Sequence, residues 1–145
     1  INYSNIEIFK FYLEKSLSLY RKIFFERVDL FDSIITANDL NADLINGIEE
    51  LQPFGKGNPE PMFILKDIII DSIKIIKNKH HLIFFENDMG QKIKGICFNS
   101  KNTIFGDHLE KFVEHKFNFA CTVRNDKFSS KPLPQIIIRD IMKIN

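Results

Sequence analysis

A nine-residue segment rich in proline and glycine divides this chain into two parts with different hydrophobic periods. Residues 53–61 read Pro-Phe-Gly-Lys-Gly-Asn-Pro-Glu-Pro, a composition that neither a helix nor a central strand tolerates. Apolar residues recur every three or four positions before this segment and every second position after it. We therefore expect a helical segment over residues 1–52, an ordered linker and domain boundary at 53–61, and a β-rich domain over 62–145.

Two helices are expected in the first part. Ser4 and Glu7 form an S-x-x-E capping box, which predicts that a helix begins there. A short extended stretch over residues 28–35 comes next, and Asn41 can cap a second helix that Pro53 ends. The apolar stripe of the first helix is about five turns long, which predicts that the helix packs against another part of the protein. This stripe consists of Ile6, Phe9, Leu13, Leu17, Tyr20 and Phe24.

The second part has the pattern of a small β-domain. Residues 62–76, 80–86 and 91–98 are expected to form three strands, with turn residues at 87–90. A capping box of Asp107 and Glu110 predicts a short helix, and two more strands are expected over 117–124 and 135–144. This is the element order of an OB-fold. The expected fold class is α+β, with an amino-terminal helical segment followed by a five-stranded OB-fold-like β-barrel.

Composition excludes several other classes of protein. No apolar run approaches the roughly 20 residues of a membrane span, so no membrane contact is expected. Cys97 and Cys121 lack a CxxC pattern, which indicates reduced thiols and a cytoplasmic location. We find no catalytic set, and the adjacent His80 and His81 point to opposite faces of a strand, so neither a metal site nor a cofactor is expected in this chain. The chain begins at Ile1 without a targeting signal, as expected for a piece of a longer protein.

Charge is distributed unevenly along the chain. Residues 1–52 contain 5 Lys/Arg and 9 Asp/Glu, a net charge of −4, whereas residues 53–145 contain 15 and 10, a net charge of +5. An OB-fold binds ligands across its second and third strands and in the flanking loops, which are the basic segments here. An aromatic ring among lysines can stack on a base; Phe128 either does so or folds back onto the barrel, and Phe84 and Phe98 are further candidates. The expected DNA contacts from this pattern are Lys77, Lys79, Lys92, Lys94, Arg124, Lys127, Phe128 and Lys131.

Residues 53–63 resemble the PFGxGNPEPxF signature of the RecJ family of single-stranded-DNA-specific exonucleases. Residues 79–82 are similar to the family's Gly-Lys-x-His-Leu stretch, although Asn78 stands where the family often has glycine. Residues 95–99, 124–128 and 138–141 also resemble family segments, and the resemblance adds His81 and Asn125 to the expected DNA contacts. We expect a mainly structural role for the motif segment; the alternative is that Lys56 and Asn58 contact phosphate. The structural residues of this segment are Pro53, Phe54, Gly55, Gly57, Asn58, Pro59 and Pro61.

The resemblance implies a non-catalytic carboxy-terminal fragment. The family's GGHxxAAG and DHH motifs, which belong to upstream catalytic domains that bind Mn²⁺ or Mg²⁺ for 5′-to-3′ hydrolysis, do not occur in this sequence. The implied role is to hold single-stranded DNA for an exonuclease in DNA recombination and repair. An alternative is a protein-docking OB module that recruits a partner such as single-stranded-DNA-binding protein, whose acidic tail the lysines would attract. An independent enzyme is the weakest interpretation.

We predict that the isolated chain has no nuclease activity, because two-metal hydrolysis needs a cluster of carboxylate and imidazole ligands that this sequence lacks. End-labelled single-stranded DNA incubated with the purified chain and Mn²⁺ or Mg²⁺ should stay intact. Release of mononucleotides that is sensitive to EDTA and that co-purifies with the chain would contradict this prediction.

Overall fold

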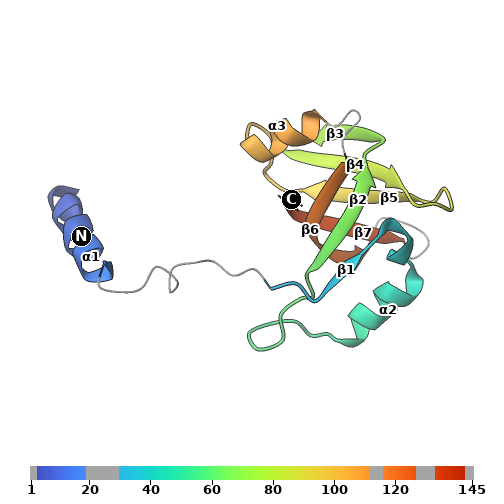
Figure 1. Ribbon diagram of the computed structural model, residues 1–145, viewed down its shortest axis with the longest axis horizontal. Helices are drawn as coiled ribbons and strands as arrows, with labels where there is room; N and C mark the ends of the chain where they lie inside the picture. The colour runs from blue at the N-terminus through green and yellow to red at the C-terminus, as the bar shows by residue number, and fades with distance from the viewer. Residues whose placement is uncertain (1–2, 19–29, 112–115, 127–132, 143–145) are drawn as a thin grey trace. The chain divides into compact units, whose positions relative to one another are not determined.

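The structure, a computed structural model, describes residues 3–18, 30–111, 116–126 and 133–142 (Figure 1). The chain forms two compact units, Ile1–Leu30 and Phe31–Asn145. The first unit contains the 3-10 helix η1 (Tyr3–Asn5) and the helix α1 (Ile6–Leu17). Asn5 is the N-cap residue of α1, one position after the predicted Ser4, so a helix that begins at this point of the chain is confirmed. The remainder of the predicted stripe lies in residues 19–29, outside the described residues, and its packing partner stays a prediction.

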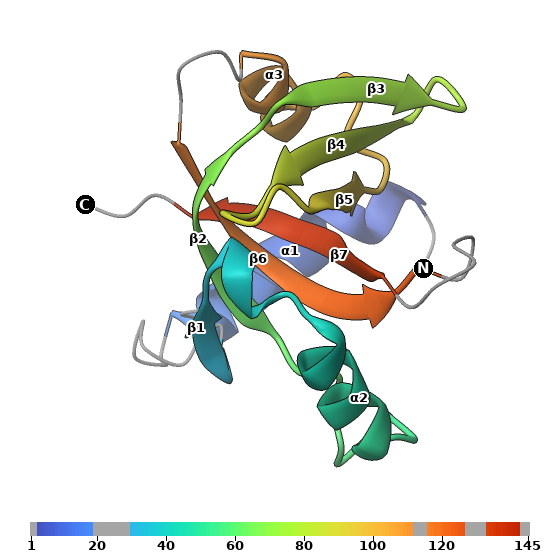
Figure 2. The same ribbon diagram turned by 90° about the vertical axis from the view of Figure 1, so that its right-hand side faces the viewer.

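The second unit is built on one seven-stranded mixed sheet with the order β1-β2-β6-β7-β5-β4-β3. The helical elements described beside it are η3 (Ala37–Asp39), α2 (Ala42–Glu50) and α3 (Ile104–Glu110). The helices α2 and α3 lie at opposite ends of this unit (Figures 1 and 2). The strands are β1 (Ser33–Ile35), β2 (Phe63–Ile69), β3 (Ser72–Ile76), β4 (His80–Glu86), β5 (Lys92–Cys97), β6 (Lys116–Asn125) and β7 (Pro134–Met142).

The predicted strand over residues 62–76 is two strands in the structure. A register shift between Leu65 and Ile68 interrupts the pairing of β2 with β6, and Asp67 there has a φ of 58°. A residue in this left-handed conformation marks a bulge, which bends the strand. The chain then leaves β2 and continues as β3 at the far end of the sheet order. The connectivity is OB-like, but the sheet has seven strands in an open order, so the predicted five-stranded barrel is not confirmed.

The helices α2 and α3 begin at side-chain caps. The Asn41 side chain accepts a hydrogen bond from the Leu44 backbone N–H at 3.0 Å, as predicted for the start of α2. Thr103 is the N-cap residue of α3, and its hydroxyl accepts a hydrogen bond from the Gly106 N–H at 3.1 Å. A short helix between the third and fourth predicted strands is therefore confirmed, but the capping box at Asp107 is wrong.

Residues 31–52 belong to the same compact unit as the sheet. The strand β1 pairs in parallel with β2, from Ser33 opposite Phe63 to Ile35 opposite Leu65. Ile45 and Ile48 of α2 are buried. The chain therefore divides at Leu30 and Phe31 in the structure, and not in the proline- and glycine-rich segment, because long-range strand pairing holds the preceding residues to the sheet.

The segment 53–61 is a tight loop held by Asn58. The backbone groups of Gly55 and Asn58 exchange two hydrogen bonds of 2.8 and 3.1 Å. The Asn58 side-chain amide donates to the carbonyl oxygens of Leu51 and Pro53, at 2.8 and 3.0 Å. Phe54 packs against the core, Pro59 is exposed, and Pro61 leads into β2. Asn58 thus ties the loop to the end of α2, which supports a structural role for this segment.

The two glycines of this loop differ in conformation. Gly57 has a φ of 99°, a region that side chains other than glycine rarely adopt. Gly55 has no such φ, and a Cβ atom there would meet nothing within 4 Å. Gly57 therefore has a positive φ, one of the two properties for which a glycine is needed in such a loop. Gly55 has neither a positive φ nor a close contact.

We predict that Gly57→Val lowers the free energy of unfolding by about 1–3 kcal/mol, because a β-branched residue is strained at positive φ. Thermal unfolding followed by circular dichroism measures this loss, and Gly55→Ala is the matched control that should melt like the wild type. Affinity for single-stranded DNA, measured well below the melting temperature, should stay unchanged in both variants. A wild-type melting temperature with lost binding would instead place the loop in direct contact with phosphate.

Candidate nucleic-acid interface

The strands β3, β4 and β5 present one face to the core and one to the outside. Their inner face contributes buried Ile83, Phe85 and Ile93. On the other face the sheet register places Lys74 opposite Leu82, and Leu82 opposite Ile96. These outward side chains are exposed or half-buried. We call this side of β3, β4 and β5 the outer face. It corresponds to the surface that we expected from the sequence to bind nucleic acid.

An ordered pair of rings lies at one end of the outer face. The rings of His80 and Phe98 are 5.3 Å apart between centroids, at an interplanar angle of 77°. The His80 Nδ1 atom accepts a hydrogen bond of 2.8 Å from the Asn99 backbone N–H, which fixes the imidazole. Phe98 is 54% exposed although it is large and apolar. An aromatic ring that is fixed in orientation and exposed, such as Phe98, offers a surface on which a nucleic-acid base can stack.

Lysines occur in the segments that adjoin this ring pair. Lys77 and Lys79 lie in the tight turn between β3 and β4, as predicted, and Lys77 and Asn78 both have a positive φ, of 51° and 52°. Both lysines are exposed, and neither forms an ion pair within the described part of the chain. The Lys101 backbone N–H donates to the Lys79 carbonyl at 3.2 Å, and its ammonium donates to the Asn78 side chain. Lys101 therefore joins the same turn.

Phe98 could be found from the sequence pattern, whereas Lys101 could not. Phe98 follows Lys92, Lys94 and Ile96 at the period of a strand, so alternation alone places it on their face. Lys101 comes after β5 has ended, and its proximity to the turn at Lys79 depends on how the chain folds back. His80 is half-buried against Phe98.

Two of the predicted cations on or near the outer face have acidic partners. Lys94 is 27% exposed and its ammonium lies 2.5 Å from the Asp126 carboxylate. Lys92 lies on the same face, as predicted, is 77% exposed and is 3.7 Å from Glu86. Lys92 is therefore the better exposed of the two, and Lys94 mainly connects β5 to the end of β6.

Arg124 is anchored to the proline- and glycine-rich loop. Its guanidinium donates two hydrogen bonds to Glu60, of 2.6 and 2.7 Å. This bond to the Glu60 carboxylate raises the pKa of Arg124 above its usual value. Asn125 next to it accepts the Leu133 N–H at 3.2 Å with its side-chain oxygen. Both residues lie at the end of β6 as expected, but each has a structural partner.

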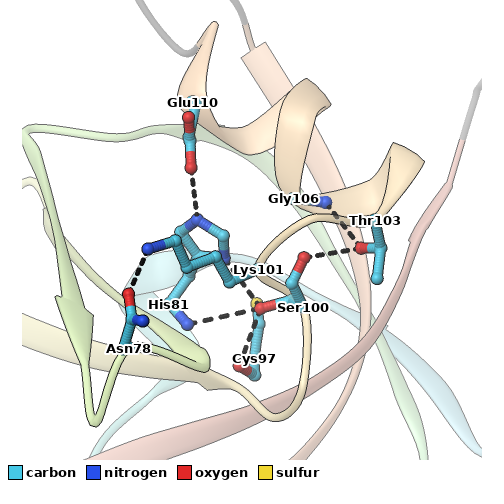
Figure 3. Close-up of polar contacts among 8 residues, drawn as sticks. All are labelled: Asn78, His81, Cys97, Ser100, Lys101, Thr103, Gly106 and Glu110. Carbon is cyan, nitrogen blue, oxygen red and sulfur yellow. Dashed lines mark hydrogen bonds and ion pairs between the residues drawn. The ribbon is translucent and has the colours of Figure 1, made fainter.

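The prediction that His81 contacts DNA is corrected, because this side chain is fully buried. His81 and His80 alternate across β4, and His81 is on the core side. Figure 3 shows its ring between Ser100 and Glu110: Nδ1 lies 2.8 Å from the Ser100 hydroxyl, and Nε2 lies 3.0 Å from the Glu110 carboxylate. A Cβ atom on Gly106 would lie 2.8 Å from the ring and 2.1 Å from the Ser100 carbonyl oxygen. His81 thus fixes α3 against the sheet.

The remaining predicted contacts, Lys127, Phe128 and Lys131, lie outside the described residues. The described ends of their connection are Asp126 and Leu133, and the Asp126 N–H donates to the Leu133 carbonyl at 2.8 Å. The segment therefore joins β6 to β7, as predicted. The roles of these three residues stay predictions.

Cysteine and metal chemistry are not indicated by the described residues. Burial raises the pKa values of both thiols, that of Cys121 to about 12 and that of Cys97 further. Residues 3–18, 30–111, 116–126 and 133–142 contain no group of three His, Cys, Asp or Glu side chains placed to hold a metal ion.

None of the helices within these ranges is long and apolar enough to cross a membrane.

Comparison with known proteins identifies the family. The family model of the RecJ OB domain matches residues 31–140. Among solved structures, the chain is similar to the crystal structure of RecJ in complex with Mn²⁺ from Thermus thermophilus, with 14% identity and a TM-score of 0.66. That match covers 100% of this chain and 20% of the RecJ chain, and at this identity it supports the fold alone. No curated protein matches significantly. Because the family model covers well over half of the sequence, the chain belongs to the RecJ OB-domain family.

Proposed function

We propose that this chain is the single-stranded-DNA-binding OB module of a RecJ-like 5′-to-3′ exonuclease that acts in DNA recombination and repair. The observation that carries the proposal is the His80–Phe98 ring pair, in which Phe98 is exposed, together with Lys77 and Lys79 in the adjoining turn and Lys101, which contacts that turn. Rings and cations together are what sequence-independent binding of single strands requires, because every base has a π-face and every nucleotide a phosphate.

The two kinds of side chain have different tasks in this proposal. A base stacks on Phe98, whose orientation the T-shaped contact with His80 holds. Lys77 and Lys79 neutralise phosphates, since their ammonium groups have no acidic partner in the described part of the chain. Lys92 extends the basic surface along β5. Asn125, Lys127, Phe128 and Lys131 are further contacts of the strand in this proposal, and they belong to the end of β6 and its connection to β7.

Paired cations contribute less in this proposal. A phosphate that binds Arg124 or Lys94 must compete with Glu60 or Asp126, both of which already make short contacts with these cations. These two pairs therefore mainly hold the segment around Glu60 and the end of β6 in place. His81, which is buried, takes no part in DNA binding.

Hydrolysis belongs to other domains of the proposed parent enzyme. The Mn²⁺ or Mg²⁺ expected for that enzyme would be bound by upstream catalytic domains of the same protein, and the present chain would hold the strand that they cut. The proposed location of this enzyme is the cytoplasm.

We predict that Lys77→Ala combined with Lys79→Ala flattens the plot of log affinity against log salt concentration by up to roughly 1.4, because each phosphate contact on a single strand contributes about −0.7 to this slope. Phe98→Ala should lower affinity by roughly 1–3 kcal/mol and leave the slope nearly unchanged, because an uncharged ring releases no counterion. Fluorescence anisotropy of labelled poly-dT at several salt concentrations measures both effects.

Lys56→Ala is the matched control for the lysine variants, because Lys56 is an exposed lysine in the loop at 53–61. It should bind with the affinity and slope of the wild type. If the Lys77/Lys79 and Phe98 variants also bind like the wild type, the outer face is not the DNA path. Loss of binding to an acidic peptide in the Lys77/Lys79 variant, with DNA binding intact, would favour the alternative of a docking module for a partner such as single-stranded-DNA-binding protein.

A further inference from the structure

A groove between α2 and the β1–β2 pair is a second surface of this unit, separate from the outer face. It has a volume of about 390 Å³, within the range of roughly 300–1,000 Å³ that is usual for ligand pockets. Its walls include the apolar side chains of Leu44, Ile48 and Phe63 and the carboxylates of Asp32 and Asp43. We call this surface the acidic groove. The strand β1 beside it and the strand β3 of the outer face are the two ends of the sheet order.

Gly47 lies in the wall of the acidic groove and in the interior of α2. Glycine inside a helix costs about 0.5–1 kcal/mol relative to alanine. The fold does not require this residue, because its φ is not in the left-handed region and a Cβ atom there would meet nothing within 4 Å. Because Gly47 has no side chain, the groove is open at this point of its wall and has room for a side chain from another molecule.

The charge around the groove indicates what this occupant is. Residues 31–52 contain five acidic residues and no Lys, Arg or His, whereas residues 53–145 carry a net charge of +5. The Asp32 carboxylate is fixed in place, since it accepts a hydrogen bond of 2.8 Å from the Met62 N–H. Asp43, Glu49 and Glu50 form no ion pair with any described residue, and all three are exposed. Such a surface repels a phosphate backbone or an acidic tail and attracts cations.

We propose that the acidic groove binds a segment of a partner protein in which an apolar side chain is flanked by Lys or Arg. The apolar side chain enters beside Gly47 and contacts Leu44, Ile48 and Phe63. The flanking cations lie near Asp32 and Asp43. This inference does not depend on DNA binding by the outer face, so the two surfaces can be tested independently.

The experiment uses three short amidated peptides as probes with the isotope-labelled full chain. One peptide has leucine flanked by lysines, the second has glutamates in place of the lysines, and the third has alanine in place of leucine. Only the lysine–leucine peptide is expected to shift backbone amide resonances of α2 and β1 in two-dimensional NMR spectra. Gly47→Leu should weaken its binding by about tenfold or more, because the new side chain fills the groove.

Gly47→Ala is the matched control, since it adds only a Cβ atom in open space and should bind the lysine–leucine peptide like the wild type. Both Gly47 variants should melt at or above the wild-type temperature, because glycine is the weaker helix former. Asp43→Asn is a second variant that leaves the groove's shape unchanged. It should weaken binding of the lysine–leucine peptide and make that binding less sensitive to salt.

Several results would overturn the proposal. One is equal binding of the glutamate–leucine peptide, or binding that is unchanged in both Gly47→Leu and Asp43→Asn. Another is a shift of the same α2 amides by poly-dT that the peptide suppresses, which would assign the groove to nucleic acid. A concentration-dependent dimer in analytical ultracentrifugation that Gly47→Leu dissociates would assign it to a second copy of this chain.

Discussion

The parallel pairing of β5 with β7 is the contact on which the arrangement of the second unit depends. It joins the antiparallel group β3-β4-β5 to the antiparallel group β2-β6-β7 and so makes one sheet from both. Gly95 lies at this junction, where an added Cβ atom would be 2.7 Å from the Ile83 side chain and 3.0 Å from that of Ile136. The core side chains thus approach the backbone of β5 directly, which fixes the side of each strand that faces inward.

The two surfaces of this unit follow from that packing. Once Ile83, Phe85 and Ile93 occupy the core, the alternate residues of the same strands must face outward, among them His80, Lys92 and Ile96, and Phe98 follows directly after β5. The acidic groove is formed by the segment that adds β1 and α2 at the other end of the sheet order, and this segment contains no Lys, Arg or His. A single small unit therefore presents an aromatic, basic surface and an apolar groove with acidic walls, which differ in the partners they attract.

Features set by local chemistry could be predicted from the sequence, whereas those set by contacts between distant residues could not. The Asn41 cap of α2 and the left-handed Gly57 depend on residues within a few positions of one another. By contrast, the bond of Arg124 to Glu60 spans 64 positions. Adjacent histidines must face opposite sides of a strand, but which one is buried depends on Ser100 and Glu110, 19 and 29 positions away from His81.

Chemical-shift mapping of the isotope-labelled chain with a short oligo-dT strand tests the central claim most directly, because it locates the bound strand without altering any residue. The account predicts that the amide shifts concentrate in the turn between β3 and β4, at the start of β4 and in residues 98–101 after β5. It also predicts that the amides of α2 and β1 do not move. Shifts confined to α2 and β1, or a spectrum unchanged by saturating oligo-dT, would contradict the assignment of the outer face as the single-strand-binding surface.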